Sequence, residues 1–310
     1  MSLLKQSAKQ STEQLFTQTP SPEQVITPSW LNLHNIQISI KRDDLLHPII
    51  SGNKWRKLKY ALSQASDNDV THIVSFGGGY SNHLHALGYC CQQLGIHLSA
   101  IVRGDYSQNL SPMLRDLLDW GVDIQYVDRI TYQQRADPEY LQALTIKYPD
   151  ALLIPEGGSQ QQALKGVAEI IQELTHHYDY ILAPVASGGT LAGLIDGVAQ
   201  QKNMTPCQIL GIAVLKGQDY LEQLVDTLLT GRQHQVDWHI NHDYQFGGYA
   251  KSNSELNHFC TDFKQQTHIP IEPVYSGKLF YALHKLTISG RFPSGSRVLA
   301  LHTGGLQGAR

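Results

Sequence analysis

Short apolar runs alternate with longer amphipathic stretches along most of the chain. The short runs are continuous, as expected for strands that are buried on both faces. In the stretches between them, apolar residues recur with the spacing of a helix face. The predicted strands cover residues 73–76, 98–102, 124–127, 152–154, 181–185, 209–214 and 298–301, and the predicted helices cover 53–65, 82–94, 164–174 and 191–199.

This alternation predicts an α/β fold in which βαβ units build open, twisted parallel sheets with helices on both faces. The chain has 310 residues. At roughly 150 residues per domain, that length suggests two domains. Neither an internal repeat nor a low-complexity linker separates the two halves, so we expect two lobes that are joined by several crossings of the chain.

Composition and charge narrow the possible partners. Hydrophobic residues make up 41% of the chain and the net charge is −3, which is typical of a globular protein and excludes a disordered one. Near-neutral charge gives no electrostatic footprint for nucleic acid or for an anionic membrane surface. No stretch approaches the roughly 18 apolar residues of a membrane span. We therefore expect no nucleic-acid or membrane partner.

The cysteines and histidines indicate neither disulfides nor a metal site. The chain has four cysteines without a C-x-x-C pair, and a disulfide between the adjacent Cys90 and Cys91 would be strained. None of the fifteen histidines lies in an H-E-x-x-H motif, so we expect no metal site. The polar N-terminal sixteen residues lack the apolar core of a secretory signal. These features favour a cytoplasmic protein with reduced thiols.

The first of three polar clusters is Ser-Gly-Asn-Lys-Trp-Arg-Lys at residues 51–57, directly before a predicted helix. Lys54 would lie in the first helical turn, where the positive end of the helix dipole disfavours an ammonium and lowers its pKa. A neutral amine can form a Schiff base with an aldehyde cofactor. On this pattern alone, an ordinary surface lysine is the better explanation of Lys54.

Two glycine-rich turns follow predicted strands. Gly-Gly-Gly-Tyr-Ser-Asn-His at residues 77–83 has the layout of an anion site on free backbone N–H groups, or of a plain helix cap at Ser81. Ala-Ser-Gly-Gly-Thr at residues 186–190 lets a phosphate approach the backbone at the start of a helix. No G-K-[ST] follows it, so a phosphate monoester site or an ordinary turn fits better than a nucleotide P-loop.

Taken together, these clusters resemble a known family. In combination with Lys-Arg-Asp-Asp at residues 41–44, Pro-Val-Tyr-Ser-Gly-Lys at 273–278 and His-Thr-Gly-Gly at 302–305, they resemble the pyridoxal-phosphate enzymes of the tryptophan-synthase-β-like fold, fold type II. The resemblance extends from about residue 38 to the C-terminus. It is closer to the branch that contains 1-aminocyclopropane-1-carboxylate (ACC) deaminase and D-cysteine desulfhydrase.

The resemblance implies pyridoxal 5'-phosphate as cofactor and a role for each matching residue. Lys54 would hold the cofactor as a Schiff base and then move protons. Ser81 would grip the substrate carboxylate, with Tyr80, Asn82 and His83 beside it. The remaining roles are a ring-hydroxyl contact for Asn82, a phosphate site at Ser187, Gly188, Gly189 and Thr190, substrate contact or acid–base work for Tyr249 and Tyr275, and a pyridine-nitrogen contact for Thr303.

The resemblance also implies a reaction. A neutral hydroxyl at Thr303 makes the ring a weaker electron sink than a carboxylate would, which suits β-elimination of a good leaving group. ACC-deaminase-type members carry Glu and Leu where this chain has Ser276 and Thr303. We therefore expect an enzyme that converts a small amino acid such as D-cysteine to a keto acid, ammonia and sulfide. The alternatives are ACC deaminase and a cofactor-binding protein without efficient turnover, in which Tyr80 would obstruct the substrate.

The same resemblance implies a homodimer of two-domain subunits. The large, cofactor-binding domain would combine residues 1–54 with 156–310. The small α/β domain would span residues 55–155.

Overall fold

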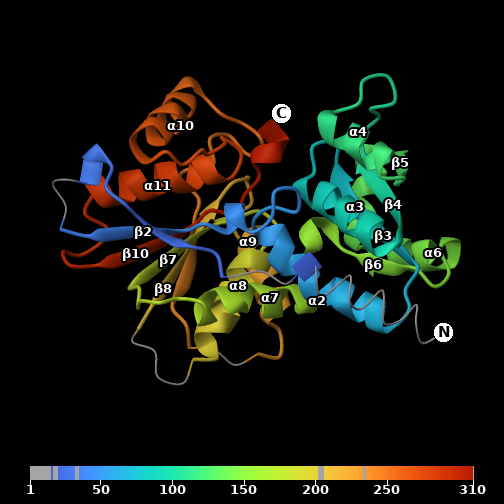
Figure 1. Ribbon diagram of the computed structural model, residues 1–310, viewed down its shortest axis with the longest axis horizontal. Helices are drawn as coiled ribbons and strands as arrows, with labels where there is room; N and C mark the ends of the chain where they lie inside the picture. The colour runs from blue at the N-terminus through green and yellow to red at the C-terminus, as the bar shows by residue number, and fades with distance from the viewer. Residues whose placement is uncertain (1–14, 17–19, 32–34, 202–205, 233–234, 310) are drawn as a thin grey trace.

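The computed structural model describes residues 15–16, 20–31, 35–201, 206–232 and 235–309. Two sheets lie in separate halves of the molecule, and helix α2 (Asn53–Asp67) runs between them (Figure 1). The N-terminal residues that argue against a secretory signal lie outside the described residues up to position 14. No helix of the described ranges is long and apolar enough to cross a membrane.

The larger sheet has six strands, and all of its pairings are parallel except that of the edge strand β1 with β2. Its central strands include the three predicted from the apolar runs near residues 181, 209 and 298, which confirms them. The edge strands β1 and β9 and the neighbouring β2 were not predicted. In sheet order the strands are β1 (Glu23–Ile26), β2 (Gln37–Lys41), β10 (Arg297–Leu301), β7 (Tyr180–Val185), β8 (Gln208–Ala213) and β9 (Trp238–Asn241).

The smaller sheet is parallel throughout and contains the other four predicted strands. Each of its strands covers one predicted apolar run and extends beyond it by a few residues at most. In sheet order they are β5 (Asp123–Val127), β4 (His97–Arg103), β3 (His72–Gly78) and β6 (Leu152–Ile154).

Helices cover both faces of both sheets, as predicted. The four predicted helices correspond to α2, α3, α7 and α8. The helices besides α2 are α3 (Asn82–Leu94), α4 (Pro112–Asp119), α5 (Arg129–Gln133), α6 (Pro138–Lys147), α7 (Gln161–Gln172), α8 (Gly189–Ala199), α9 (Tyr220–Leu229), α10 (Ser254–Thr267) and α11 (Ser276–Ile288).

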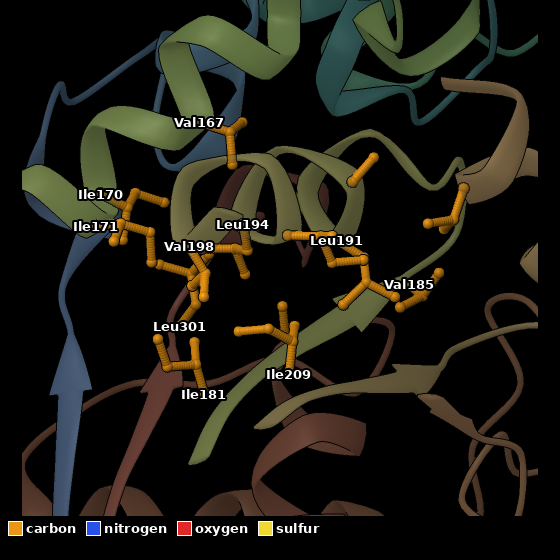
Figure 2. Packing of buried hydrophobic residues seen from close by; sticks show 14 of the residues in the cluster. Val167, Ile170, Ile171, Ile181, Val185, Leu191, Leu194, Val198, Ile209 and Leu301 are labelled. Carbon is orange, nitrogen blue, oxygen red and sulfur yellow. The ribbon is translucent and has the colours of Figure 1, made fainter. Parts of the chain in front are cut away.

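The core of the larger sheet follows from the alternation of side chains along its strands. Ile181 and Ile209 point toward α7 and α8, where they pack against residues such as Leu194 (Figure 2). The next residues along the same strands, Leu182 and Leu210, pack on the opposite face with residues of α11. Burial on both faces explains why these strands are continuous apolar runs in the sequence.

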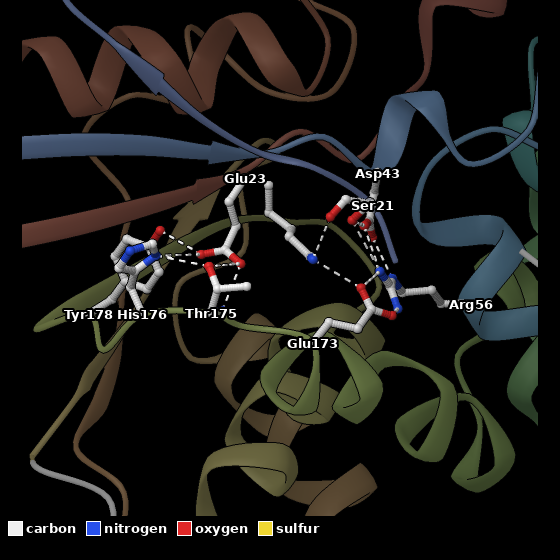
Figure 3. A network of polar contacts seen from close by, with 9 residues as sticks. Ser21, Glu23, Asp43, Arg56, Glu173, Thr175, His176 and Tyr178 are labelled. Carbon is white, nitrogen blue, oxygen red and sulfur yellow. Dashed lines mark hydrogen bonds and ion pairs between the residues drawn. The ribbon is translucent and has the colours of Figure 1, made fainter. Parts of the chain in front are cut away.

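A buried network of charges fixes α2 against the larger sheet (Figure 3). The guanidinium of Arg56 binds both carboxylate oxygens of Asp43 at 2.7 and 2.8 Å and also contacts Glu173, with the shortest distance 2.7 Å. Lys41, at the end of β2, binds Glu173 at 2.9 Å and the carbonyl oxygen of Ser21 at 2.7 Å. Two cations thus share two carboxylates, and the network joins β2, α2 and the end of α7.

All four cysteines are buried free thiols. Cys90 and Cys91 lie side by side in α3, as the helical pattern predicts. Burial raises the pKa of both thiols, which keeps them protonated and unreactive.

Candidate active site

Lys54 is the second residue of α2, and a glycine turn places it. Gly52 precedes the helix with a φ of 64°, and a β-carbon on it would lie 1.8 Å from the carbonyl oxygen of Thr303. The same carbonyl accepts a hydrogen bond from the backbone N–H of Asn53 at 3.2 Å. The Asn53 side chain donates to the Thr190 hydroxyl at 2.8 Å. The lysine turn is therefore packed between the segments that follow β10 and β7.

The environment of Lys54 lowers the pKa of its amine to about 8. Burial is the main cause, and the nearby carboxylate of Glu156 opposes it. The sequence predicts the direction of this shift, but from the helix dipole, whereas desolvation is the larger effect in the structure. A neutral amine is therefore accessible near neutral pH, as a Schiff-base lysine requires.

The turn after β3 places a second set of predicted residues. Ser81 caps α3, and its hydroxyl accepts the backbone N–H of Leu84 at 3.2 Å. Asn82 begins the helix, and its buried side-chain oxygen has no hydrogen-bond partner among the described residues. A β-carbon on Gly305 would lie 3.4 Å from the Asn82 amide nitrogen, so this side chain faces the C-terminal segment.

Tyr80 and His83 flank this turn in different environments. Tyr80 is 52% exposed, and its ring packs edge-on against Tyr106. His83 is 2% exposed, and its Nε2 lies 2.8 Å from the hydroxyl of Ser75 in β3. Burial together with the charges of two lysines, Lys54 and Lys57, lowers the pKa of His83 well below its usual range, so the imidazole is neutral.

The turn after β7 is a cradle of small residues. Gly188 adopts a φ of 74° before α8, and a β-carbon on Gly189 would lie 3.2 Å from the Lys57 amine and 2.6 Å from the Ser159 hydroxyl. The hydroxyls of Ser159 and Ser187 are 2.7 Å apart. Backbone N–H groups at the start of α8, two hydroxyls and one amine therefore converge on the predicted phosphate site.

Lys57 belongs to this site although the sequence analysis did not select it. It is buried, and its amine contacts the Ser159 hydroxyl at 3.2 Å but no acid within the described part of the chain. A buried cation without a counter-charge is costly unless an anion binds it, so the surroundings fit a phosphate. The signal was present in the sequence, because Lys54 and Lys57 are three residues apart and hence share one helix face.

Two tyrosines and a buried acid complete the site from the larger sheet. The Tyr275 hydroxyl donates to that of Tyr249 at 3.0 Å. Glu272, which the sequence analysis also missed, accepts the backbone N–H groups of Val274, Tyr275 and Ser276 at the start of α11. Burial raises the pKa of Glu272 to about 7, although these hydrogen bonds oppose the shift.

The predicted residues therefore meet at one place, where the carboxyl ends of strands from both sheets face each other. Ser81 and Asn82 follow β3, Ser187 to Thr190 follow β7, and the nearly buried Thr303 follows β10. Ligands of open α/β sheets bind at such carboxyl ends. Three features fit a planar cofactor with a phosphate tail: the orphaned side-chain oxygen of Asn82, the Lys57 amine without an acidic partner in the described ranges, and the glycine cradle. No group of three or more potential metal ligands occurs in the described ranges.

Comparisons with known proteins agree with this geometry. A protein of Pyrococcus horikoshii, provisionally named a 1-aminocyclopropane-1-carboxylate deaminase, is 29% identical over 283 residues, which cover 87% of this chain and 85% of the relative. The mitochondrial bifunctional D-cysteine desulfhydrase/1-aminocyclopropane-1-carboxylate deaminase of Arabidopsis thaliana is 28% identical, over 88% of this chain and 73% of the relative. The crystal structure of an ACC deaminase homologue superposes with a TM-score of 0.77 at 26% identity, covering 96% of both chains.

The family model described as "Pyridoxal-phosphate dependent enzyme" matches residues 17–304, which is nearly the whole chain. The fold, with its two parallel sheets and helices on both faces, is the tryptophan-synthase-β-like fold type II that the sequence predicts. The matched residues include the lysine turn, both glycine-rich turns and the tyrosine pair. The chain belongs to the family of pyridoxal-phosphate dependent enzymes.

Proposed function

We propose that this enzyme is a lyase that catalyses β-elimination from a small amino acid, with D-cysteine as the model substrate and a keto acid, ammonia and sulfide as products. The observation that carries this choice of reaction is that the side chains of Ser276 and Thr303 are both uncharged. Ser276 is fully buried, and within the described part of the chain its hydroxyl hydrogen-bonds only to Glu272, at 2.9 Å from the backbone nitrogen and 3.1 Å from a carboxylate oxygen.

Glu272 itself is committed to the start of α11. Its oxygens accept three backbone N–H groups, and one oxygen also accepts the Ser276 hydroxyl, so these contacts compete with any bond from a ring nitrogen. The hydroxyl of Thr303 remains as the group for that position in this proposal. A ring without a carboxylate partner is a weaker electron sink, which is sufficient when a good leaving group departs from the β-carbon.

The residues of the site would hold the cofactor as follows. Lys54 would bind its aldehyde carbon, the Asn82 amide its ring hydroxyl, and Thr303 its ring nitrogen. Its phosphate would lie among Lys57, Ser159 and the turn at residues 187–190. When bound, the cofactor supplies an electron sink for the bonds at the substrate α-carbon.

The other residues would bind substrate and move protons. Ser81 and the backbone N–H groups of its turn would hold the substrate carboxylate. Once substrate has taken its place, the Lys54 amine, with its lowered pKa, can accept a proton near neutral pH. Burial raises the pKa of Tyr275 well above its usual range, and the neighbouring Tyr249 adds to the shift, so both phenols stay protonated and can donate to a leaving group.

The test is to titrate the holoenzyme with D-cysteine, L-cysteine and ACC while measuring sulfide and keto acid. We expect sulfide and pyruvate from D-cysteine and no 2-oxobutanoate from ACC. The names of two relatives make ACC deamination the second candidate, and 2-oxobutanoate formed faster than sulfide would establish it instead. A cofactor spectrum that none of the three compounds changes would contradict the proposal and favour a binding protein without turnover.

The organisation of the subunit is part of the same proposal. The strands β3 to β6 all lie within residues 55–155, and the strands of the larger sheet all lie outside that range. This distribution supports a small domain at 55–155 and a large one formed by 1–54 and 156–310. We further propose a cytoplasmic homodimer, which size-exclusion chromatography with light scattering and cell fractionation would test.

A further inference from the structure

Arg103 lies at the edge of the smaller sheet where the site residues converge. It is the last residue of β4 and stands in register with Gly78 at the end of β3, three residues before Ser81. A β-carbon on Gly78 would lie 3.7 Å from one terminal nitrogen of its guanidinium. The side chain is exposed, so a ligand can reach it.

Two guanidinium groups and one carboxylate surround the ring of Tyr132 in α5. The guanidinium carbons of Arg103 and Arg135 lie 5.5 and 5.0 Å from the ring centroid. Glu156 binds Arg135 at 2.5 Å and accepts the Tyr132 hydroxyl at 2.7 Å. The Arg103 guanidinium makes neither a hydrogen bond nor an ion pair with any described residue. The cluster therefore keeps one uncompensated positive charge, on Arg103.

This cluster is close enough to the proposed catalytic groups to act on them electrostatically. Burial raises the pKa of Tyr249, and the charge of Arg103 opposes part of that rise. From the same cluster, the carboxylate of Glu156 opposes the lowering of the pKa of Lys54. The register with Gly78, which leads into the turn of Ser81, places this cluster at the border of the site on the side of the smaller sheet.

We propose that Arg103 is a specificity-determining residue that binds a second anionic group, carried at the end of the substrate side chain. The proposal rests on the proposed β-elimination and names its substrate class: α-amino acids whose β-substituent ends in a carboxylate or phosphate. In the proposed function the substrate α-carboxylate binds at Ser81, so it does not account for this cation. The side chain of cysteine carries no such charge at neutral pH, because a thiol ordinarily has a pKa near 8.5. D-Cysteine would then be a poorer substrate of the same site.

The test compares matched pairs of amino acids in the holoenzyme. The probes are aspartate against asparagine and O-phosphoserine against serine, each as both enantiomers. The change in visible absorbance of the bound cofactor gives a Kd for each, and sulfide release from D-cysteine is measured in parallel. We expect at least one anionic member to bind on the order of tenfold to a hundredfold more tightly than its neutral partner, as for a charge-assisted hydrogen bond.

Three variants assign that preference to Arg103. Arg103→Gln should abolish it, and Arg103→Lys should keep part of it. Arg129→Gln changes an exposed arginine at the start of α5 and should leave it intact. Equal binding of charged and neutral partners by the wild-type enzyme, or a preference that survives in Arg103→Gln, would overturn the proposal while sulfide release still supports the lyase. Absence of both sulfide release and any spectral response would refute the proposed function itself.

Discussion

The carbonyl oxygen of Thr303 accepts the backbone N–H of Asn53 at 3.2 Å, one residue before Lys54. This contact joins the C-terminal segment to the turn that carries the lysine. It brings a residue that follows the last strand of the larger sheet against the backbone at the start of α2. The position of Lys54 therefore depends on close packing between two backbone segments that are far apart in the sequence.

Gly52 permits this close packing, and a side chain there should destroy it. In Gly52→Ala, the β-carbon would lie 1.8 Å from the Thr303 carbonyl oxygen, in a backbone conformation that non-glycine residues avoid. We expect the variant to lose bound cofactor and most of its stability in urea unfolding. Gly95→Ala is the matched control, because Gly95 has a similar φ but open space around it, and it should cost only about 1–2 kcal/mol. Equal behaviour of the two variants would contradict this explanation.

Removal of the Lys57 amine should affect the phosphate of the cofactor and not its ring. We expect Lys57→Met to weaken the binding of pyridoxal phosphate by about tenfold to a hundredfold, the range for loss of a charge-assisted hydrogen bond. Binding of pyridoxal, which lacks the phosphate, should change little. Lys59→Met, which removes an amine paired with Glu169 at 2.8 Å, is the control. Equal losses for pyridoxal and pyridoxal phosphate would contradict the assignment of this site.

The apoprotein of Lys57→Met should be at least as stable as the wild type. Burial lowers the pKa of Lys57 well below its usual range, and the charge of Lys54 adds to this, so the protonated lysine destabilises the fold. That penalty is present at neutral pH and decreases as the pH rises toward the pKa of an unfolded lysine. Urea unfolding of both apoproteins at pH 7 and pH 9.5 measures it. We expect the two apoproteins to differ less in free energy of unfolding at pH 9.5 than at pH 7.

The lowered pKa of Lys54 predicts how the apoprotein takes up its cofactor. With a pKa of about 8, the neutral fraction of the amine rises about tenfold per pH unit below that value and then levels off. The rate at which the visible band appears after addition of pyridoxal phosphate should follow this curve between pH 6 and pH 9.5. A rate that still rises tenfold per unit above pH 9 would show an ordinary, solvated lysine.

Loss of the Arg56 side chain should destabilise the protein, because it would leave a buried carboxylate without its partner. In Arg56→Met, the carboxylate of Asp43 stays buried without its partner, which typically costs about 3–5 kcal/mol. The double variant with Asp43→Asn removes that orphaned charge and should recover part of the loss. Urea unfolding of the wild type, both single variants and the double variant provides the cycle. Strictly additive effects would mean that the two residues do not act as a pair.

The parts of the fold that the sequence predicts are those dominated by local pattern. The inner strands are apolar on both faces, so β7 and β8 are visible as continuous runs. By contrast, β2 ends in Lys41, which is fully buried only because Glu173 and the carbonyl of Ser21 surround its amine. No local pattern can reveal a partner that the tertiary fold brings from the end of another helix.

The candidate site shows the same division. Lys54, Asn82 and the glycine turn at 187–190 lie in motifs whose spacing is visible along the chain. Arg103 acquires its significance from neighbours that are distant in sequence, Tyr132 and Tyr249. Glu272 acquires its significance from burial by the tertiary fold. Lys57 lies between these two cases. The sequence shows its helical spacing from Lys54, but only the structure shows that it is buried.

The most direct test of the account is to find which residue carries the cofactor. The purified protein, reconstituted with pyridoxal phosphate, is reduced with borohydride, and the modified peptide is identified by mass spectrometry. We predict a visible absorption band that reduction abolishes, with the label on Lys54, and neither band nor label in Lys54→Ala. A label on Lys57 or another lysine, or no band after reconstitution, would contradict the central claim that the turn at Gly52 positions Lys54 to hold the cofactor.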